Sequence, residues 1–142
     1  MKIRLPLLLL CFLLIAGSLA GCALSGRETA IGSVTLTDEV DAVSKAAKTA
    51  LSSFPKEAKT FYASVQVLHP DKGTRVGARW FYDKDGNGSY NLIDSAEVTF
   101  AQSGDRYAAF SLTATSTFPS GAYKVIVLLN GNEVRELKFS VL

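Results

Sequence analysis

The sequence predicts an all-β fold, a sandwich of about seven antiparallel strands, in residues 33–142. Three observations support this prediction. From Phe61 onward, apolar residues recur at every second position, which is the period of a strand with one buried face. Residues that favour turns interrupt this alternation. The alternating segments follow one another about every ten residues, the spacing that is typical of sandwiches.

The expected strands are separated by recognisable turns. Alternating apolar residues predict strands at 61–67, 76–82, 96–100, 108–114, 123–129 and 137–141. Gly, Pro, Asn or Asp mark the turns at 69–73, 102–105, 118–121 and 130–131. Asn130-Gly131 is typical of a two-residue hairpin, because both central residues of a type I′ turn need a positive φ. Val134 is out of phase with the last strand, which predicts a β-bulge near Arg135 or Glu136.

Residues 34–54 fit two different structures. Val34 and Leu36 begin like a strand. Beyond Asp38, which would cap a helix, six apolar residues fall on one helical face, namely Val40, Val43, Ala47, Ala50, Leu51 and Phe54. Propensity favours a helix over 41–51, and the alternative is a first strand followed by a long loop.

The N-terminal residues have the three parts of a bacterial export signal. Lys2 and Arg4 make a positive start, residues 5–16 are apolar, and small residues dominate 17–21. The segment Leu19-Ala20-Gly21-Cys22 resembles the lipobox of bacterial lipoprotein precursors. The resemblance implies a diacylglycerol on the Cys22 thiol, cleavage before Cys22, and acylation of the new amine, with palmitate as a typical acyl group. The alternative is an uncleaved membrane anchor over residues 5–24, against which Pro6 and the position of Cys22 argue.

The expected organisation is a signal peptide at 1–21, a lipidated Cys22 with a flexible tether at 22–32, and one domain at 33–142. Ala23 follows the cysteine where an Asp would retain the protein at the inner membrane. By resemblance to the sorting rules, this implies an outer-membrane location facing the periplasm in a Gram-negative host. Cys11 leaves with the signal peptide, so the mature domain must fold without a disulfide.

The charge of the mature chain excludes one class of partner. The chain has 15 Lys and Arg and 13 Asp and Glu, and Lys2 and Arg4 lie in the leader, which leaves 13 of each sign. A neutral domain has no electrostatic attraction for nucleic acid. We therefore expect membrane attachment through Cys22 and no nucleic-acid partner.

Two aromatic residues resemble features of immunoglobulin-like sandwiches. Trp80 lies in the strand expected at 76–82, and Tyr123 lies in Gly121-Ala122-Tyr123-Lys124-Val125. They resemble the core tryptophan and the tyrosine corner of that fold. The resemblance implies structural roles for both, with the Tyr123 hydroxyl bonded to backbone upstream.

A wider pattern resembles a group of uncharacterised bacterial secreted and lipid-anchored immunoglobulin-like domains. It consists of Thr60-Phe61-Tyr62-Ala63, Gly73-Thr74-Arg75-Val76, Arg79-Trp80-Phe81-Tyr82, Phe118-Pro119-Ser120-Gly121-Ala122-Tyr123 and Leu129-Asn130-Gly131-Asn132. In that group, residues 34–42 are an opening strand, so the resemblance reduces the expected helix to a short turn. No activity attaches to the group.

Residues 83–94 contain one candidate metal site. Asp83-Lys84-Asp85-Gly86-Asn87-Gly88-Ser89 matches the first seven positions of an EF-hand-type loop. Calcium would bind the side chains of Asp83, Asp85 and Asn87, the carbonyl of Ser89, and Asp94 at the twelfth position, where Glu is usual. The alternative is a polar hairpin loop, since turns favour the same residues.

Catalytic groups are sparse, and we expect no enzyme and no cofactor other than the calcium of that alternative. His69 is the only histidine, and it precedes Pro70 in a turn. The sequence has no G-x-S-x-G motif, and no cysteine of the mature domain is left as a nucleophile.

The leading hypothesis is a lipid-anchored binding or structural module of the cell envelope that contacts an unknown protein or glycan. The alternative is a calcium-binding domain that uses the 83–94 loop. Aromatic residues in the outward phase are the candidates for an exposed contact face, namely Tyr62, Phe81, Tyr90 and Tyr107.

Overall fold

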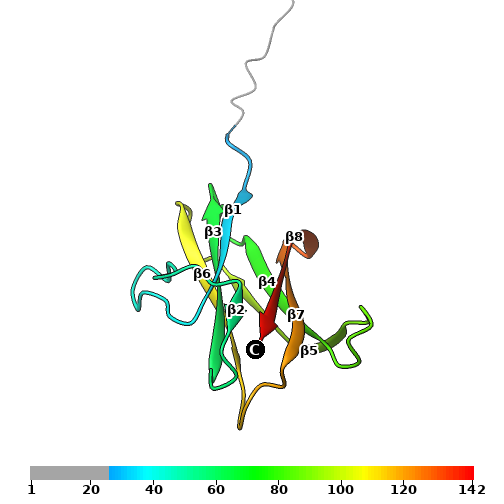
Figure 1. Ribbon diagram of the computed structural model, residues 1–142. Coiled ribbons are helices and arrows are strands. Elements are labelled where there is room, and N and C mark those ends of the chain that lie inside the picture. The colour runs from blue at the N-terminus through cyan, green and yellow to red at the C-terminus, as the bar shows by residue number, and fades with distance from the viewer. Residues whose placement is uncertain (1–25) are drawn as a thin grey trace, which may run out of the picture.

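The computed structural model describes residues 26–142, and the predicted signal peptide and Cys22 lie outside this range. Within residues 26–142, eight strands form two sheets that face each other, and there is no helix (Figure 1). The predicted all-β sandwich is confirmed. The strand beyond the expected seven is the two-residue β2.

The two sheets differ in size. The smaller has the order β1-β3-β6 and consists of β1 (Ala30–Thr37), β3 (Thr60–Leu68) and β6 (Arg106–Thr113). The larger has the order β2-β8-β7-β4-β5 and consists of β2 (Ser53–Phe54), β4 (Arg75–Asp83), β5 (Asn91–Thr99), β7 (Gly121–Leu129) and β8 (Asn132–Val141). All neighbouring strands are antiparallel except β2, which runs parallel to β8.

Alternation places one face of each sheet in a shared core, where aromatic rings gather. Phe61 of β3 lies at the centre, and its ring contacts those of Phe54, Phe118, Tyr123 and Phe139, with centroid distances of 3.9–6.1 Å. These four residues belong to β2, β7, β8 and the segment before β7, so Phe61 joins the small sheet to the large one.

The segment after β1 is a loop, which confirms the alternative of a first strand followed by a long loop, and the helix that propensity alone favours over 41–51 does not form. Asp41 accepts hydrogen bonds from the amides of Val43 and Ser44, which makes a single turn, and Lys45 then takes a positive φ of 67°. Val43 is 90% exposed. The apolar helical face had no apolar surface to pack on, because the loop lies over the polar outer side of β3, where Ser64 donates to the Lys45 carbonyl.

The first strand begins earlier than expected. β1 starts at Ala30, inside the 22–32 segment predicted to be a tether, and Ile31 is buried in the core. Thr29 donates its hydroxyl to the carbonyl of His69, 2.8 Å away. The sequence did not indicate this start, because residues 23–32 are mostly small or polar. Ile31 is the only large apolar residue between Ala30 and Val34.

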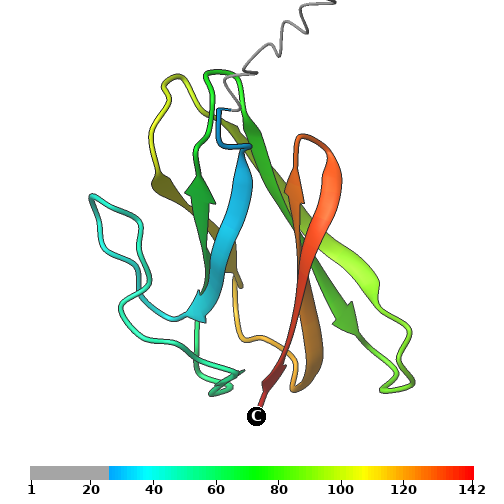
Figure 2. The same ribbon diagram turned by 90° about the horizontal axis from the view of Figure 1, so that it is seen from above.

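The third expected strand, predicted at 96–100, begins earlier, at Asn91, and it does not have the predicted burial. Ala96 and Val98 were expected to face the core, yet all of β5 is exposed and only Phe100, just after it, is buried. β5 is the edge of the large sheet, and much of it runs away from the strands of the small sheet (Figure 2). The predicted bulge in β8 is confirmed, since Val127 pairs with Arg135 and Leu128 with Glu133, which leaves Val134 as the extra residue.

The two ends of the sandwich carry different loops. The end where β1 begins also holds the turn after β3, the turn before β6 and the hairpin of Asn130 and Gly131, both of which have a positive φ (Figure 1). The opposite end holds loops 55–59 and 114–120 and the C-terminal Leu142. No helix among residues 26–142 is long and apolar enough to span a membrane.

Candidate functional site

The candidate calcium loop is a hairpin loop that its own hydrogen bonds close. Asp83, the buried last residue of β4, accepts the amides of Asn87 and Gly88 on its two carboxylate oxygens, at 3.2 and 2.7 Å. The side chain of Asn87 in turn accepts the amide of Ser89 at 2.9 Å. Gly86 and Gly88 have φ of 66° and 85°, which other residues rarely adopt. The carboxylate of Asp83 therefore organises the loop by accepting hydrogen bonds from backbone amides of other loop residues.

The structure does not bring Asp94 to this loop. Asp94 lies on β5 opposite Trp80, three residues and thus about 10 Å along the strand from Asp83. The hydrogen bonds of the loop join Asp83, Asn87 and Ser89, whereas the side chain of Asp85 is exposed and outside them. Among residues 26–142, no three His, Cys, Asp or Glu side chains gather closely enough to hold a metal ion. Calcium binding by this loop stays a prediction.

We expect Asp83→Asn to lower the free energy of unfolding by about 1–2 kcal/mol. An amide side chain has one acceptor oxygen for two backbone amides, and it lacks the charge that strengthens both bonds. Asp85→Asn, in the same loop but exposed, is the matched control and should change stability by less than about 0.5 kcal/mol. Urea denaturation measures both, and equal effects would refute the role of Asp83.

The same variants test calcium. A melting temperature that rises in about 1 mM calcium but not in magnesium, and no longer rises in Asp83→Asn, would establish the loop as a weak site of the extracellular kind.

His69 has a structural role at the opposite end of the domain. Its backbone amide donates to Asp105 at 2.6 Å, its Nδ1 lies 3.4 Å from the same carboxylate oxygen, and its carbonyl accepts the hydroxyl of Thr29. It adopts a positive φ of 50°. His69 thus joins the turn after β3 to the turn before β6 and to the start of β1.

Tyr123 and Trp80 lie on the side of the large sheet that faces the core. The buried Tyr123 donates its hydroxyl to the carbonyl of Pro119, 2.7 Å away and four residues upstream, which is the geometry of a tyrosine corner. Burial raises the pKa of Tyr123 to about 12, and the neighbouring Tyr82 adds to the shift. Trp80 packs edge-on against Phe139, and its indole Nε1 is buried without a hydrogen-bond partner.

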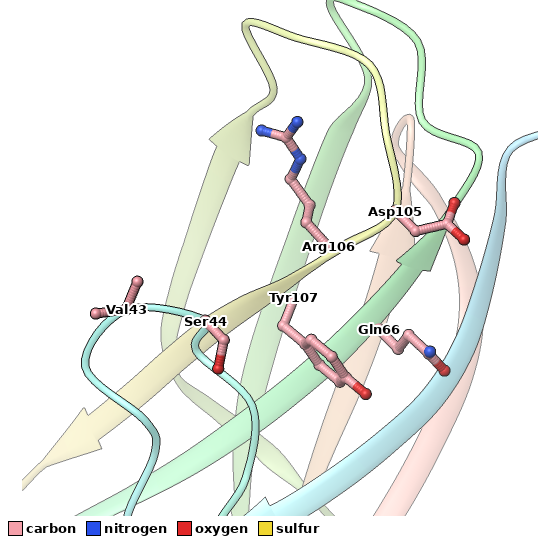
Figure 3. Close-up of a pocket in the computed structure, with 6 residues that line it drawn as sticks. All are labelled: Val43, Ser44, Gln66, Asp105, Arg106 and Tyr107. Carbon is pink, nitrogen blue, oxygen red and sulfur yellow. The ribbon is translucent and has the colours of Figure 1, made fainter.

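A hollow of about 580 Å³ lies between the loop after β1 and the outer face of the small sheet. Its lining comes from Val43, Ser44, Gln66, Asp105, Arg106 and Tyr107. Figure 3 shows the Tyr107 ring pointing between Ser44 and Gln66, while the Arg106 guanidinium turns away. Arg106 donates to the carbonyls of Ser103 and Gly104 and lies over the Phe100 ring. The hollow thus offers an aromatic surface with polar groups at its rim.

The four outward-phase aromatic residues do not form one face. Tyr62 and Tyr107 lie on the small sheet, and Phe81 belongs to the large sheet. Tyr90 lies near Phe81, because the ammonium of Lys124 is 4.8 Å from the centre of the Tyr90 ring and 5.3 Å from the centre of the Phe81 ring. All four side chains are half-buried.

Sequence reasoning missed the polar residues of the hollow. Gln66, Asp105 and Arg106 become neighbours only because the loop after β1 folds back over β3 and β6. The single local signal was the polar Gln66 within the otherwise apolar end of β3, and an outward strand position explains that residue equally well.

The comparisons with known proteins support the fold. No protein-family model matches the chain, and no curated protein matches it. Among solved structures, an immunoglobulin-like protein from Pseudomonas aeruginosa superposes with a TM-score of 0.52 at 14% identity, over 81% of this chain and 97% of that protein. The chain therefore has an immunoglobulin-like fold.

Two enzymes also contain a similar region. An alkylpurine DNA glycosylase from Pseudomonas fluorescens has a TM-score of 0.47 at 13% identity, over 82% of this chain and 31% of the enzyme. A β-glucosidase from Listeria innocua has a TM-score of 0.49 at 10% identity, over 81% of this chain and 16% of the enzyme. The chain spans less than a third of either enzyme, and neither likeness bears on its activity.

Proposed function

We propose that this chain is a lipoprotein of the bacterial cell envelope whose immunoglobulin-like domain is a non-catalytic binding or structural module. The observation that carries the proposal is the segment Leu19-Ala20-Gly21-Cys22, which directly follows a positive start and an apolar stretch. The thiol of Cys22 accepts the lipid, and two or more acyl chains give stable anchoring. In a Gram-negative host, Ala23 directs the protein to the outer membrane, facing the periplasm.

The length of the tether limits how far the domain extends from the membrane. Seven residues, 23–29, separate Cys22 from the first residue of β1. At no more than about 3.6 Å per residue, they span at most about 25 Å. The end of the sandwich that holds His69 and Thr29 therefore stays close to the bilayer.

The chemistry of the described residues favours binding over catalysis. The lone histidine, His69, holds two turns together rather than facing a nucleophile. The hollow beside Tyr107 and the outer-face pair of Phe81 and Tyr90 each combine aromatic area with polar groups, which is the composition of contact surfaces for proteins and glycans. An unknown envelope protein or glycan is the proposed partner.

Fatty-acid labelling tests the anchor. Cells that express the full chain are fed an alkyne-tagged fatty acid, and the tag on the protein is measured after membrane fractionation. We expect label on the wild-type chain in the membrane fraction, and loss of the label in Cys22→Ser. Cys11→Ser is the matched control, because this thiol leaves with the signal peptide, and it should label like the wild type. Label that persists in Cys22→Ser, or a wild-type chain without label, would refute the anchor.

A further inference from the structure

Gln66 is held in one orientation in the hollow beside Tyr107. Its side-chain oxygen Oε1 accepts hydrogen bonds from the backbone amide and the hydroxyl of Ser33, at 3.2 and 3.3 Å. The side chain lies so close to β1 that a Cβ at Gly32 would be 2.5 Å from Oε1, so only a glycine leaves room for it. Both bonds engage the oxygen, and the two N–H groups of the amide are therefore the donors that Gln66 offers to a ligand.

Asp105 supplies an acceptor at the rim of the same hollow. One of its carboxylate oxygens accepts the backbone amide of His69 at 2.6 Å, and the side chain is 53% exposed, so the second oxygen is available to a ligand. Arg106, the only cation among the six lining residues, instead donates to the carbonyls of Ser103 and Gly104 and turns away from the hollow (Figure 3). The hollow thus has an acceptor and no cation, which disfavours an anionic ligand.

Two apolar surfaces complete the lining. Tyr107 pairs with Gln66 across β6 and β3, so its ring and the amide share the outer face of the small sheet. The second surface is Val43, which is 90% exposed. The hydrogen bond from Ser64 to the Lys45 carbonyl fixes the loop of Val43 over the sheet. The hollow therefore combines a ring, two methyl groups, a donor and an acceptor.

We propose that this hollow binds a neutral glycan through an N-acetylated amino sugar. The C–H face of the pyranose packs on the ring of Tyr107. The acetamido carbonyl accepts from the amide of Gln66, and the acetamido N–H donates to Asp105. The acetamido methyl group contacts Val43. The inference rests on the proposed binding function and deepens it, because it identifies the partner as a glycan of this class.

The position of the hollow favours a sugar over a peptide. Peptides commonly bind by adding a strand to a sheet edge, where backbone groups are unpaired. The hollow lies on the face of the small sheet, and the backbone of β3 is already paired on both sides, with β1 and with β6. Only side chains face a ligand there. Side chains that combine an aromatic ring with an amide and a carboxylate suit a sugar, which has an apolar face and many hydrogen-bonding groups.

Titration with two tetrasaccharides tests the proposal. The full chain is purified in a detergent that has no sugar head group, and binding is measured by calorimetry. The probes are chitotetraose, a β-1,4-linked tetramer of N-acetylglucosamine, and cellotetraose, the matching tetramer of glucose without acetamido groups. We expect chitotetraose to bind at least about five times more tightly than cellotetraose, because the acetamido hydrogen bonds are lost.

Variants of the lining residues locate the binding site. Tyr107→Ala and Gln66→Glu should each weaken chitotetraose binding at least about fivefold. Gln66→Glu retains the oxygen that accepts from Ser33 and removes only the donor. Val43→Ser changes a residue that is 90% exposed, so it should leave the melting temperature unchanged and reduce the preference for chitotetraose. Tyr62→Ala is the matched control, a half-buried tyrosine outside the lining, and should bind like the wild type.

Three results would overturn the proposal: equal affinity for the two tetrasaccharides, a dissociation constant for chitotetraose weaker than about 10 mM, or equal binding by Tyr107→Ala and Tyr62→Ala. Fatty-acid label on the same preparations separates this site from the anchor. A labelled chain that does not bind chitotetraose refutes the sugar site alone, whereas an unlabelled chain that binds it refutes the anchor alone.

Discussion

Phe61→Ala is expected to lower the free energy of unfolding by about 3–5 kcal/mol, the usual cost of removing a fully buried ring. Phe61 is fully buried, and its ring stacks on that of Phe118 at a centroid distance of 3.9 Å and lies tilted against that of Phe54 at 4.4 Å. It also contacts the rings of Tyr123 and Phe139 across the core. Because small domains are stable by only about 5–15 kcal/mol, the loss approaches complete unfolding. Urea denaturation of residues 23–142, followed by tryptophan fluorescence of Trp80, measures it.

Phe81→Ala is the matched control for this effect. Phe81 lies half-buried on the outer face of the large sheet, where its ring faces Lys124 rather than the core. Its loss should cost about 1 kcal/mol, since little buried volume is vacated. A Phe61→Ala domain that is no less stable than Phe81→Ala would show that the two sheets are held together elsewhere.

Alkaline pH is expected to destabilise the domain through Tyr123, by about 2 kcal/mol. Burial raises the pKa of Tyr123 to about 12, above its ordinary value of 10.0. The folded state therefore holds this proton more tightly than the unfolded chain. The resulting stability is fully present below pH 10 and is lost as the pH rises toward 12.

Denaturation midpoints between pH 8 and 11.5, compared with those of Tyr123→Phe, isolate this contribution. At neutral pH, Tyr123→Phe should cost about 1 kcal/mol, because the Pro119 carbonyl loses its donor. Above pH 10, the variant should lose less stability than the wild type. Tyr62→Phe removes a half-buried tyrosine from the small sheet and controls for general alkaline effects. Identical slopes in Tyr123→Phe and the wild type would refute the assignment.

Sequence reasoning succeeded for features that residues close together in the chain determine. The Asn130-Gly131 hairpin and the bulge at Val134 follow from backbone preferences and from the phase of one strand, and both are present. Alternation also located the second half of β5, from Ala96 onward. It could not predict the exposure of Val98, because burial depends on whether the other sheet extends beneath that strand.

The helix over 41–51 failed for a related reason. An amphipathic face stabilises a helix only when an apolar surface receives it, and the outer side of β3 presents Ser64 and Gln66 instead. In the same way, the spacing of Asp83 and Asp94 along the chain suits a loop between helices. In an extended strand, that spacing carries Asp94 away from the loop. Non-local geometry decided each of these features.

The opposite positions of the first and last strand ends have a mechanical consequence. β1 begins at the end near His69, and β8 finishes at the other end, beside Phe54 (Figure 1). If the chain is anchored as proposed, a pull between the membrane and the far end therefore acts along the strands. This pull loads the hydrogen bonds between β1 and β3, and those between β8 and β7, in shear, so that all of them bear the force at once. A pull across the strands would instead break these hydrogen bonds one after another. Such a domain resists force, and under the proposed function it transmits tension from an envelope partner to the lipid anchor.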